Sequence, residues 1–90
     1  MLSTVKKALR IKTDAYDDEL ETYIAAALYD FDRLNIAYNE DDPEPEVKTA
    51  VVVYVKSQFG NGDGEQKESL FNAYCNLRNS MYLDVSKRKN

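Results

Sequence analysis

The sequence contains no histidine, no tryptophan and a single cysteine among its 90 residues. Histidine is the usual side chain for proton transfer near neutral pH and a common metal ligand, so its absence argues against both kinds of site. Cys75 has no histidine to activate it and no second cysteine to pair with, and we interpret it as a packing residue. We therefore expect a protein that is not an enzyme and needs no metal or cofactor.

Long apolar runs are also missing, and glycine is confined to one short segment. No stretch approaches the about 18 apolar residues of a membrane-spanning helix, and no signal-peptide pattern is present, so we expect no membrane association. The segment GNGDGE, residues 60–65, fails two motif tests. A calcium loop would need acids where Phe59 and Leu70 stand, and a phosphate loop would need Lys-Ser/Thr where Glu65 and Gln66 stand. We interpret it as a connection between helices.

Acidic residues outnumber basic ones, and the charges are unevenly distributed along the chain. The formal net charge is −4. Residues 1–12 carry four bases and no acid, residues 14–46 carry twelve acids against Arg33 alone, and residues 47–90 carry seven bases and four acids. Two interpretations remain open: a solvated acidic face, or acidic and basic faces of successive copies that meet head to tail.

The most apolar stretch, AVVVYV at residues 50–55, organises the rest of the chain. Its β-branched and aromatic composition alone would favour a strand. Its flanks favour a helix instead, because Pro45 suits a first helical turn, Glu44 suits the positive end of the helix dipole, and Gly60 suits a C′ cap. We predict a central helix at about 46–59 that other helices cover on several sides.

Three more helices are predicted around this one. A short helix follows Ser3 as its N-cap and ends at about residue 10. A long amphipathic helix covers about 15–35, with apolar residues at the i, i+3, i+4, i+7 spacing, and a C-terminal helix covers about 65–81. The expected fold is therefore all-α, a small four-helix domain of residues 1–81 followed by a flexible basic C-terminal tail of residues 82–90.

Several of these segments together resemble a known family. The residues that carry the resemblance are Lys6, Leu9, Arg10 and Ile11, then Asp14, Asp17 and Asp18, then Leu20, Ile24, Ala26 and Ala27, and finally the segment 45–55. In this order and spacing, over about residues 4–80, the sequence is similar to the head–tail connector family of tailed bacteriophages. These are small α-helical adaptor or head-completion proteins, sometimes labelled DNA-packaging proteins.

The resemblance implies a structural role in the virion, at the head–tail junction. The expected assembly is a ring of copies, commonly twelve, that docks under the portal protein and extends the DNA channel. It would also present a surface to the next head-completion or tail protein. DNA would pass through without sequence-specific binding, since like charge opposes phosphate contact.

Two surfaces are candidates for these contacts. The resemblance implies that the C-terminal end reaches a neighbouring ring component, with apolar anchors and bases at Tyr82, Leu83, Val85, Lys87, Arg88 and Lys89. An acidic face at Asp17, Asp18 and Glu21 is expected to line the channel or to contact another subunit.

The alternative is a small helical nucleic-acid-binding protein of phage origin. It would use the bases Lys6, Lys7, Arg10 and Lys12, or the basic C-terminal tail. A strongly acidic middle third argues against a dominant positive face.

Overall fold

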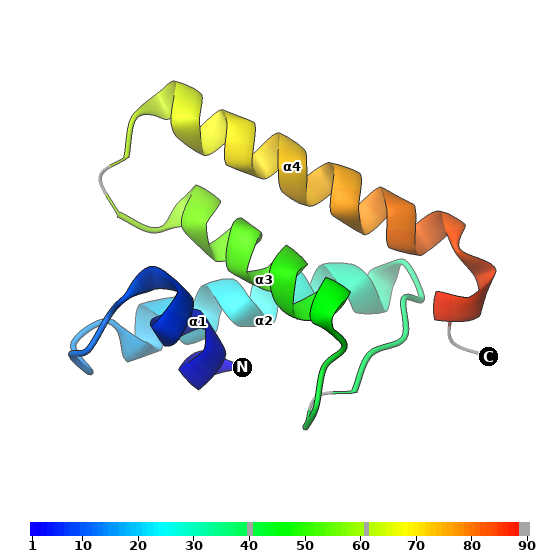
Figure 1. Ribbon diagram of the computed structural model, residues 1–90, viewed down its shortest axis with the longest axis horizontal. Helices are drawn as coiled ribbons and strands as arrows, with labels where there is room; N and C mark the ends of the chain where they lie inside the picture. The colour runs from blue at the N-terminus through cyan, green and yellow to red at the C-terminus, as the bar shows by residue number, and fades with distance from the viewer. Residues whose placement is uncertain (40, 61, 89–90) are drawn as a thin grey trace.

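The computed structural model describes residues 1–39, 41–60 and 62–88. Within these ranges the chain forms helices and no strand, apart from one isolated antiparallel bridge between Ile36 and Arg88. The elements are α1 (Leu2–Leu9), α2 (Asp17–Arg33), α3 (Pro45–Gln58), α4 (Gly64–Leu83) and the short 3-10 helix η1 (Val85–Lys87) (Figure 1). The prediction of a small all-α domain with four α-helices is confirmed.

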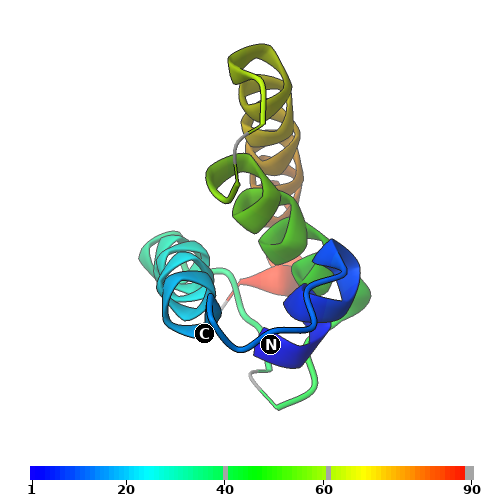
Figure 2. The ribbon, with the colours of Figure 1, turned by 90° about the vertical axis from the view of Figure 1, so that its left-hand side faces the viewer.

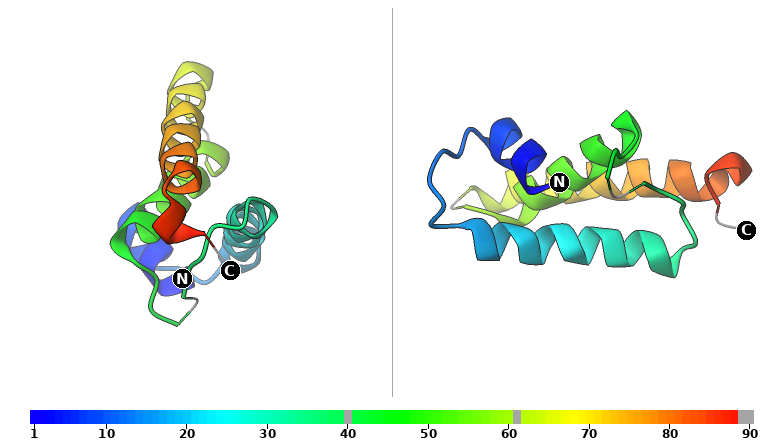
Figure 3. Two further views of the ribbon diagram at one scale, coloured as in Figure 1. Left: turned by 90° about the vertical axis from the view of Figure 1, so that its right-hand side faces the viewer. Right: turned by 90° about the horizontal axis from the view of Figure 1, so that it is seen from below.

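Helix α3 is the centre of the molecule, as predicted from its apolar sequence. It packs against α1, α2 and α4, and it runs in the opposite direction to α2 and α4 (Figures 1 and 3). Val47, Val51 and Val55 are fully or almost fully buried. Pro45 occupies the first turn of the helix, as predicted. The chain leaves the helix at Phe59, which is extended, and Gly60 follows at φ +86°, in the left-handed region that glycine adopts without strain.

Helix α2 contributes one buried stripe to the core. Leu20, Ile24, Ala27 and Phe31 are buried, which confirms the amphipathic pattern. The helix begins at Asp17 rather than at about residue 15, because the Thr13 hydroxyl accepts a hydrogen bond from the Ala15 amide and holds that segment in a turn. It ends at Arg33, two residues early, because Asn35 adopts a left-handed backbone with φ +60°.

Helix α1 begins earlier than predicted and uses a different cap. Ser3 lies inside the helix, and the N-cap is Met1, whose carbonyl accepts a hydrogen bond of 3.0 Å from the Val5 amide. The helix ends where Arg10 adopts φ +59°, and the Ile11 amide then bonds back to the Lys6 carbonyl at 2.9 Å. This is a left-handed helix ending built on arginine instead of glycine.

The C-terminal end differs from the expected flexible tail. Helix α4 continues two residues past 81, and η1 follows, capped by the Asp84 carboxylate, which accepts from the Ser86 amide at 3.0 Å. The Ala37 amide then donates to the Lys87 carbonyl. Residues 82–88 thus fold back onto the segment after α2, because the backbone groups of that segment are not paired within a helix. The division into a domain of residues 1–81 and a flexible tail of residues 82–90 stays a prediction. Lys89 lies outside the described residues.

Candidate interaction surfaces

The C-terminal segment, residues 82–88, exposes apolar side chains at one end of the molecule. Leu83, the last residue of α4, is 73% exposed, and Val85, the first residue of η1, is 75% exposed. Tyr82 is covered on one side by Arg88, whose guanidinium carbon lies 5.1 Å from the ring centroid. The three predicted apolar anchors thus lie at the same end of the molecule, and Leu83 and Val85 point away from the core.

The bases of this segment are engaged within the chain. The Lys87 ammonium pairs with the Glu44 carboxylate and lies 3.9 Å from Glu46, and these acids raise the pKa of Lys87 above its ordinary value. The Arg88 Nε group donates to the Tyr82 carbonyl at 3.1 Å. Lys87 thus ties the segment to the start of α3, whereas the Arg88 side chain bonds within the segment, and the contact of both bases with a partner stays a prediction.

The predicted acidic face separates into two parts. Lys6 makes 2.8 Å ion pairs with Asp14 and Asp17, and its side chain is only 15% exposed. Hydrogen bonding to Asp14 and then to Asp17 raises the pKa of Lys6, and the same contact lowers the pKa of Asp14. Asp17 is thereby drawn toward α1, and the candidate nucleic-acid ligand Lys6 is already neutralised.

The rest of the acidic face belongs to the outer side of α2. Asp18 and Glu21 are exposed, as are Ala25 and Tyr29 farther along the helix. The Tyr29 side chain is 66% exposed, a high fraction for a large aromatic residue. This outer face of α2, defined by Asp18, Glu21, Ala25 and Tyr29, therefore combines acidic groups with one aromatic group and a small residue between them.

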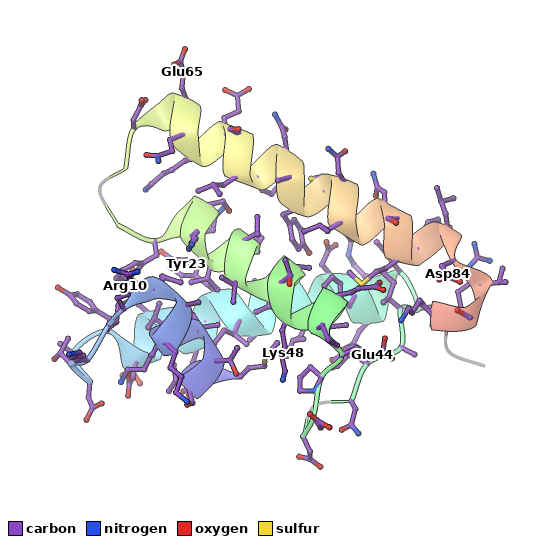
Figure 4. All side chains as sticks on the ribbon, viewed as in Figure 1. Arg10, Tyr23, Glu44, Lys48, Glu65 and Asp84 are labelled. Atoms are coloured by element: carbon purple, nitrogen blue, oxygen red, sulfur yellow. The ribbon has the colours of Figure 1, made fainter. Side chains whose placement is uncertain are left out.

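An open groove of about 610 Å³ lies along α1 and the residues that follow it. Its apolar part comes from Leu2 and Ile11, which are half-buried. Arg10 projects from the end of α1 where the chain turns toward α2 (Figure 4). The lining residues of this α1 groove are Leu2, Ser3, Lys6, Lys7, Arg10, Ile11 and Lys12.

A polar cluster joins α2 to α4 and was missed by sequence analysis. Asp30 Oδ2 accepts hydrogen bonds from the Tyr74 hydroxyl at 2.7 Å and from Arg78 at 3.0 Å, while Oδ1 accepts from Arg33 at 2.8 Å. Burial by itself would raise the pKa of Asp30, but these three donors outweigh burial and hold the pKa below its ordinary value. The sequence signal for this cluster is the position of Asp30 and Tyr74, two polar groups within the apolar stripes of their helices.

In the part of the chain that the structure describes, no group of three or more cysteine, aspartate or glutamate side chains could hold a metal ion. No helix there is long and apolar enough to cross a membrane. The features left to explain are therefore surfaces, formed by helices of one small domain.

The helical order and the packing of α3 define a small all-α domain. Residues 1–87 match the family described as phage connector protein, so the chain belongs to that family. This membership supports the role of a head–tail connector of a bacteriophage. No curated protein and no solved structure matches the chain.

Proposed function

We propose that the chain assembles as a ring under the portal protein of a tailed bacteriophage and joins the head to the tail. The observation that carries this proposal is the family match over residues 1–87, nearly the whole chain. The ring would extend the DNA channel at the head–tail junction of the virion, with twelve copies as the expected number. Its partners would be further copies, the portal, and the next head-completion or tail protein.

The C-terminal segment supplies the contact with a neighbouring ring component. Leu83 and Val85 are the most exposed large apolar side chains at this end, and burying them on a partner would stabilise docking. Because the Ala37 amide donates to the Lys87 carbonyl and the Lys87 ammonium pairs with Glu44, the anchors are presented in an ordered form, which lowers the entropic cost of docking. In this proposal Lys87 therefore positions the anchors, and Arg88 covers one side of Tyr82 within the segment.

DNA passes through the ring without sequence-specific binding. The net charge of −4 and the concentration of acids in residues 14–46 oppose contact with phosphate. The alternative role in nucleic-acid binding depends on the basic C-terminal tail, where Lys87 is already paired with Glu44, or on four bases near the N-terminus. Lys6 is already paired with two aspartates, so only three of these bases remain without an ion pair among the described residues. That number favours a connector over a nucleic-acid-binding protein.

A docking experiment with DNA-filled heads tests the proposal. Purified chain should cosediment with heads that carry a portal, and it should not bind shells assembled without one. Replacing Leu83→Ser together with Val85→Ser should abolish docking while the melting temperature stays nearly unchanged, because both side chains are exposed. The matched control is Ala73→Ser, which makes an exposed apolar position of α4 polar on a surface outside the proposed contacts, and it should dock like the wild type. Tight binding to duplex DNA that weakens steeply with salt, without docking to heads, would favour the alternative.

A further inference from the structure

The α1 groove has an unusual combination of properties for an open surface. Its floor is apolar at Leu2 and Ile11, while Lys7, Arg10 and Lys12 are exposed around it. None of these three bases forms an ion pair within the described ranges, in contrast to Lys6. A complementary ligand would therefore present an apolar group among several negative charges.

The backbone at Arg10 gives a second reason to look for a ligand here. Arg10 closes α1 with φ +59°, a left-handed conformation that is strained for a residue with a side chain and that glycine adopts freely. With arginine at this position the folded chain is less stable than it would be with glycine, but a positive charge lies beside the groove. The cost is understandable if the guanidinium has a binding role.

The outer face of α2 has the matching chemistry. Asp18 and Glu21 supply negative charge, Tyr29 supplies an exposed aromatic ring, and Ala25 lets another surface approach closely. Asp18 and Glu21 also form no ion pair among the residues that the structure describes. The two surfaces thus leave unpaired charge of opposite sign on one molecule.

These two surfaces of one copy do not face each other. The buried stripe of α2, with Ile24 and Phe31, faces the core, so its outer face is directed away from α3. Figure 2 shows α1 and α2 at the two sides of the base of the molecule, with α4 above them. A contact between unlike surfaces of successive copies is heterologous, and when repeated it closes into a ring or continues as a filament.

We propose that the outer face of α2 of one copy docks in the α1 groove of the next. Tyr29 contacts Leu2 and Ile11 of the neighbouring copy, and Asp18 and Glu21 pair with Lys7 and Arg10. The partner is thus a second copy of this chain, and DNA is disfavoured because phosphate gains nothing from the apolar floor. This contact rests on the proposed ring, since it supplies the lateral interface between neighbouring subunits.

The proposed contact joins two unlike surfaces, so charge reversals made on each surface separately can test it. One variant carries Lys7→Glu and Arg10→Glu, which reverses the groove, and the other carries Asp18→Lys and Glu21→Lys, which reverses the α2 face. Each variant alone should self-associate about tenfold or more weakly than the wild type, because like charges now meet. An equimolar mixture should recover association, since each variant complements the other. The matched control is Lys56→Glu with Glu68→Lys, two exposed residues elsewhere, and it should associate like the wild type.

Sedimentation velocity of the full chain at low salt provides the readout, with circular dichroism melting to show that each variant is folded. Variants that associate normally, or a mixture that recovers nothing, would overturn the contact. So would a wild-type chain that remains monomeric at millimolar concentration. Docking to portal-bearing heads is measured separately on the same variants. Docking without any effect of the reversals would leave the connector role standing and remove only this interface.

Discussion

The Tyr74 hydroxyl donates a 2.7 Å hydrogen bond to Asp30, 44 residues earlier in the chain. Tyr74 is 1% exposed, and its ring lies 4.9 Å from that of Tyr54 on α3 and 6.3 Å from that of Phe31 on α2. The Tyr74 side chain of α4 therefore contacts both α3 and α2. Arg78, one turn later, completes the neutralisation of Asp30 from the same helix.

Replacing Asp30→Asn should lower the free energy of unfolding by about 2 kcal/mol, because hydrogen bonds to a charged acceptor are the stronger kind and the partly buried Arg78 loses its counter-ion. Urea unfolding at neutral pH measures the change. Glu21→Gln is the matched control, an exposed acid on the same helix, and it should be nearly neutral. Equal stability of Asp30→Asn and the wild type would show that the cluster contributes nothing to folding.

The Asp30 cluster should also make stability depend on acid pH. The pKa of Asp30 is lower in the folded chain than its ordinary value of 3.8, so the unfolded chain takes up the proton first as pH falls. The contribution of Asp30 is therefore complete above about pH 4 and is lost as pH falls further. The stability gap between the wild type and Asp30→Asn should stay nearly constant from about pH 7 to about pH 5 and should shrink as the pH falls below about 4. A gap that stays constant would contradict the lowered pKa.

The helices could be predicted from sequence because their signals are local. The apolar periodicity of α2 and the flanking Pro45 and Gly60 of α3 each act within a few residues, and the structure follows them. The boundaries of α1 and α2 were less accurate, because left-handed residues such as Arg10 and Asn35 end helices without glycine.

The surfaces were harder to predict because they depend on contacts distant in sequence. The packing of Lys87 on Glu44 connects residues 43 positions apart, and no local pattern indicates it. The Asp30–Tyr74 contact is of the same kind. Leu83 and Val85 are exposed in the structure, and their predicted role as anchors for a partner stays a prediction. The α1 groove requires Leu2 and Ile11 to stay half-buried beside exposed bases, which periodicity alone does not specify.

Arg10→Gly should separate folding from association. Glycine relieves the left-handed conformation but makes the unfolded chain more flexible, so the expected net gain in stability is about 0.5 kcal/mol. Self-association should weaken, since the groove loses a charge. Arg10→Ala is the matched control: association should fall to the same degree, without any gain in stability. An Arg10→Gly chain that is both less stable and equally associated would contradict both roles of this residue.

Ending the chain after Leu83 should destabilise the domain. The truncation removes the backbone hydrogen bond from Ala37 to Lys87 and uncovers part of the fully buried Ile36. A loss of about 1 kcal/mol is expected, which for a chain of this size lowers the melting temperature by about 4–8 °C. Lys87→Gln, which keeps the backbone contact, should melt close to the wild type because exposed ion pairs contribute little. An unchanged melting temperature after truncation would show that residues 84–88 do not pack stably.

The connector role is tested most directly by removing this reading frame from the phage that encodes it. The expected result is an accumulation of DNA-filled or leaking heads and of separate, complete tails, with infectious particles restored when the purified chain is added to the extract. Electron microscopy of those restored particles should place the added chain at the single vertex that carries the portal. Normal yields of tailed, infectious virions without the chain would contradict the account.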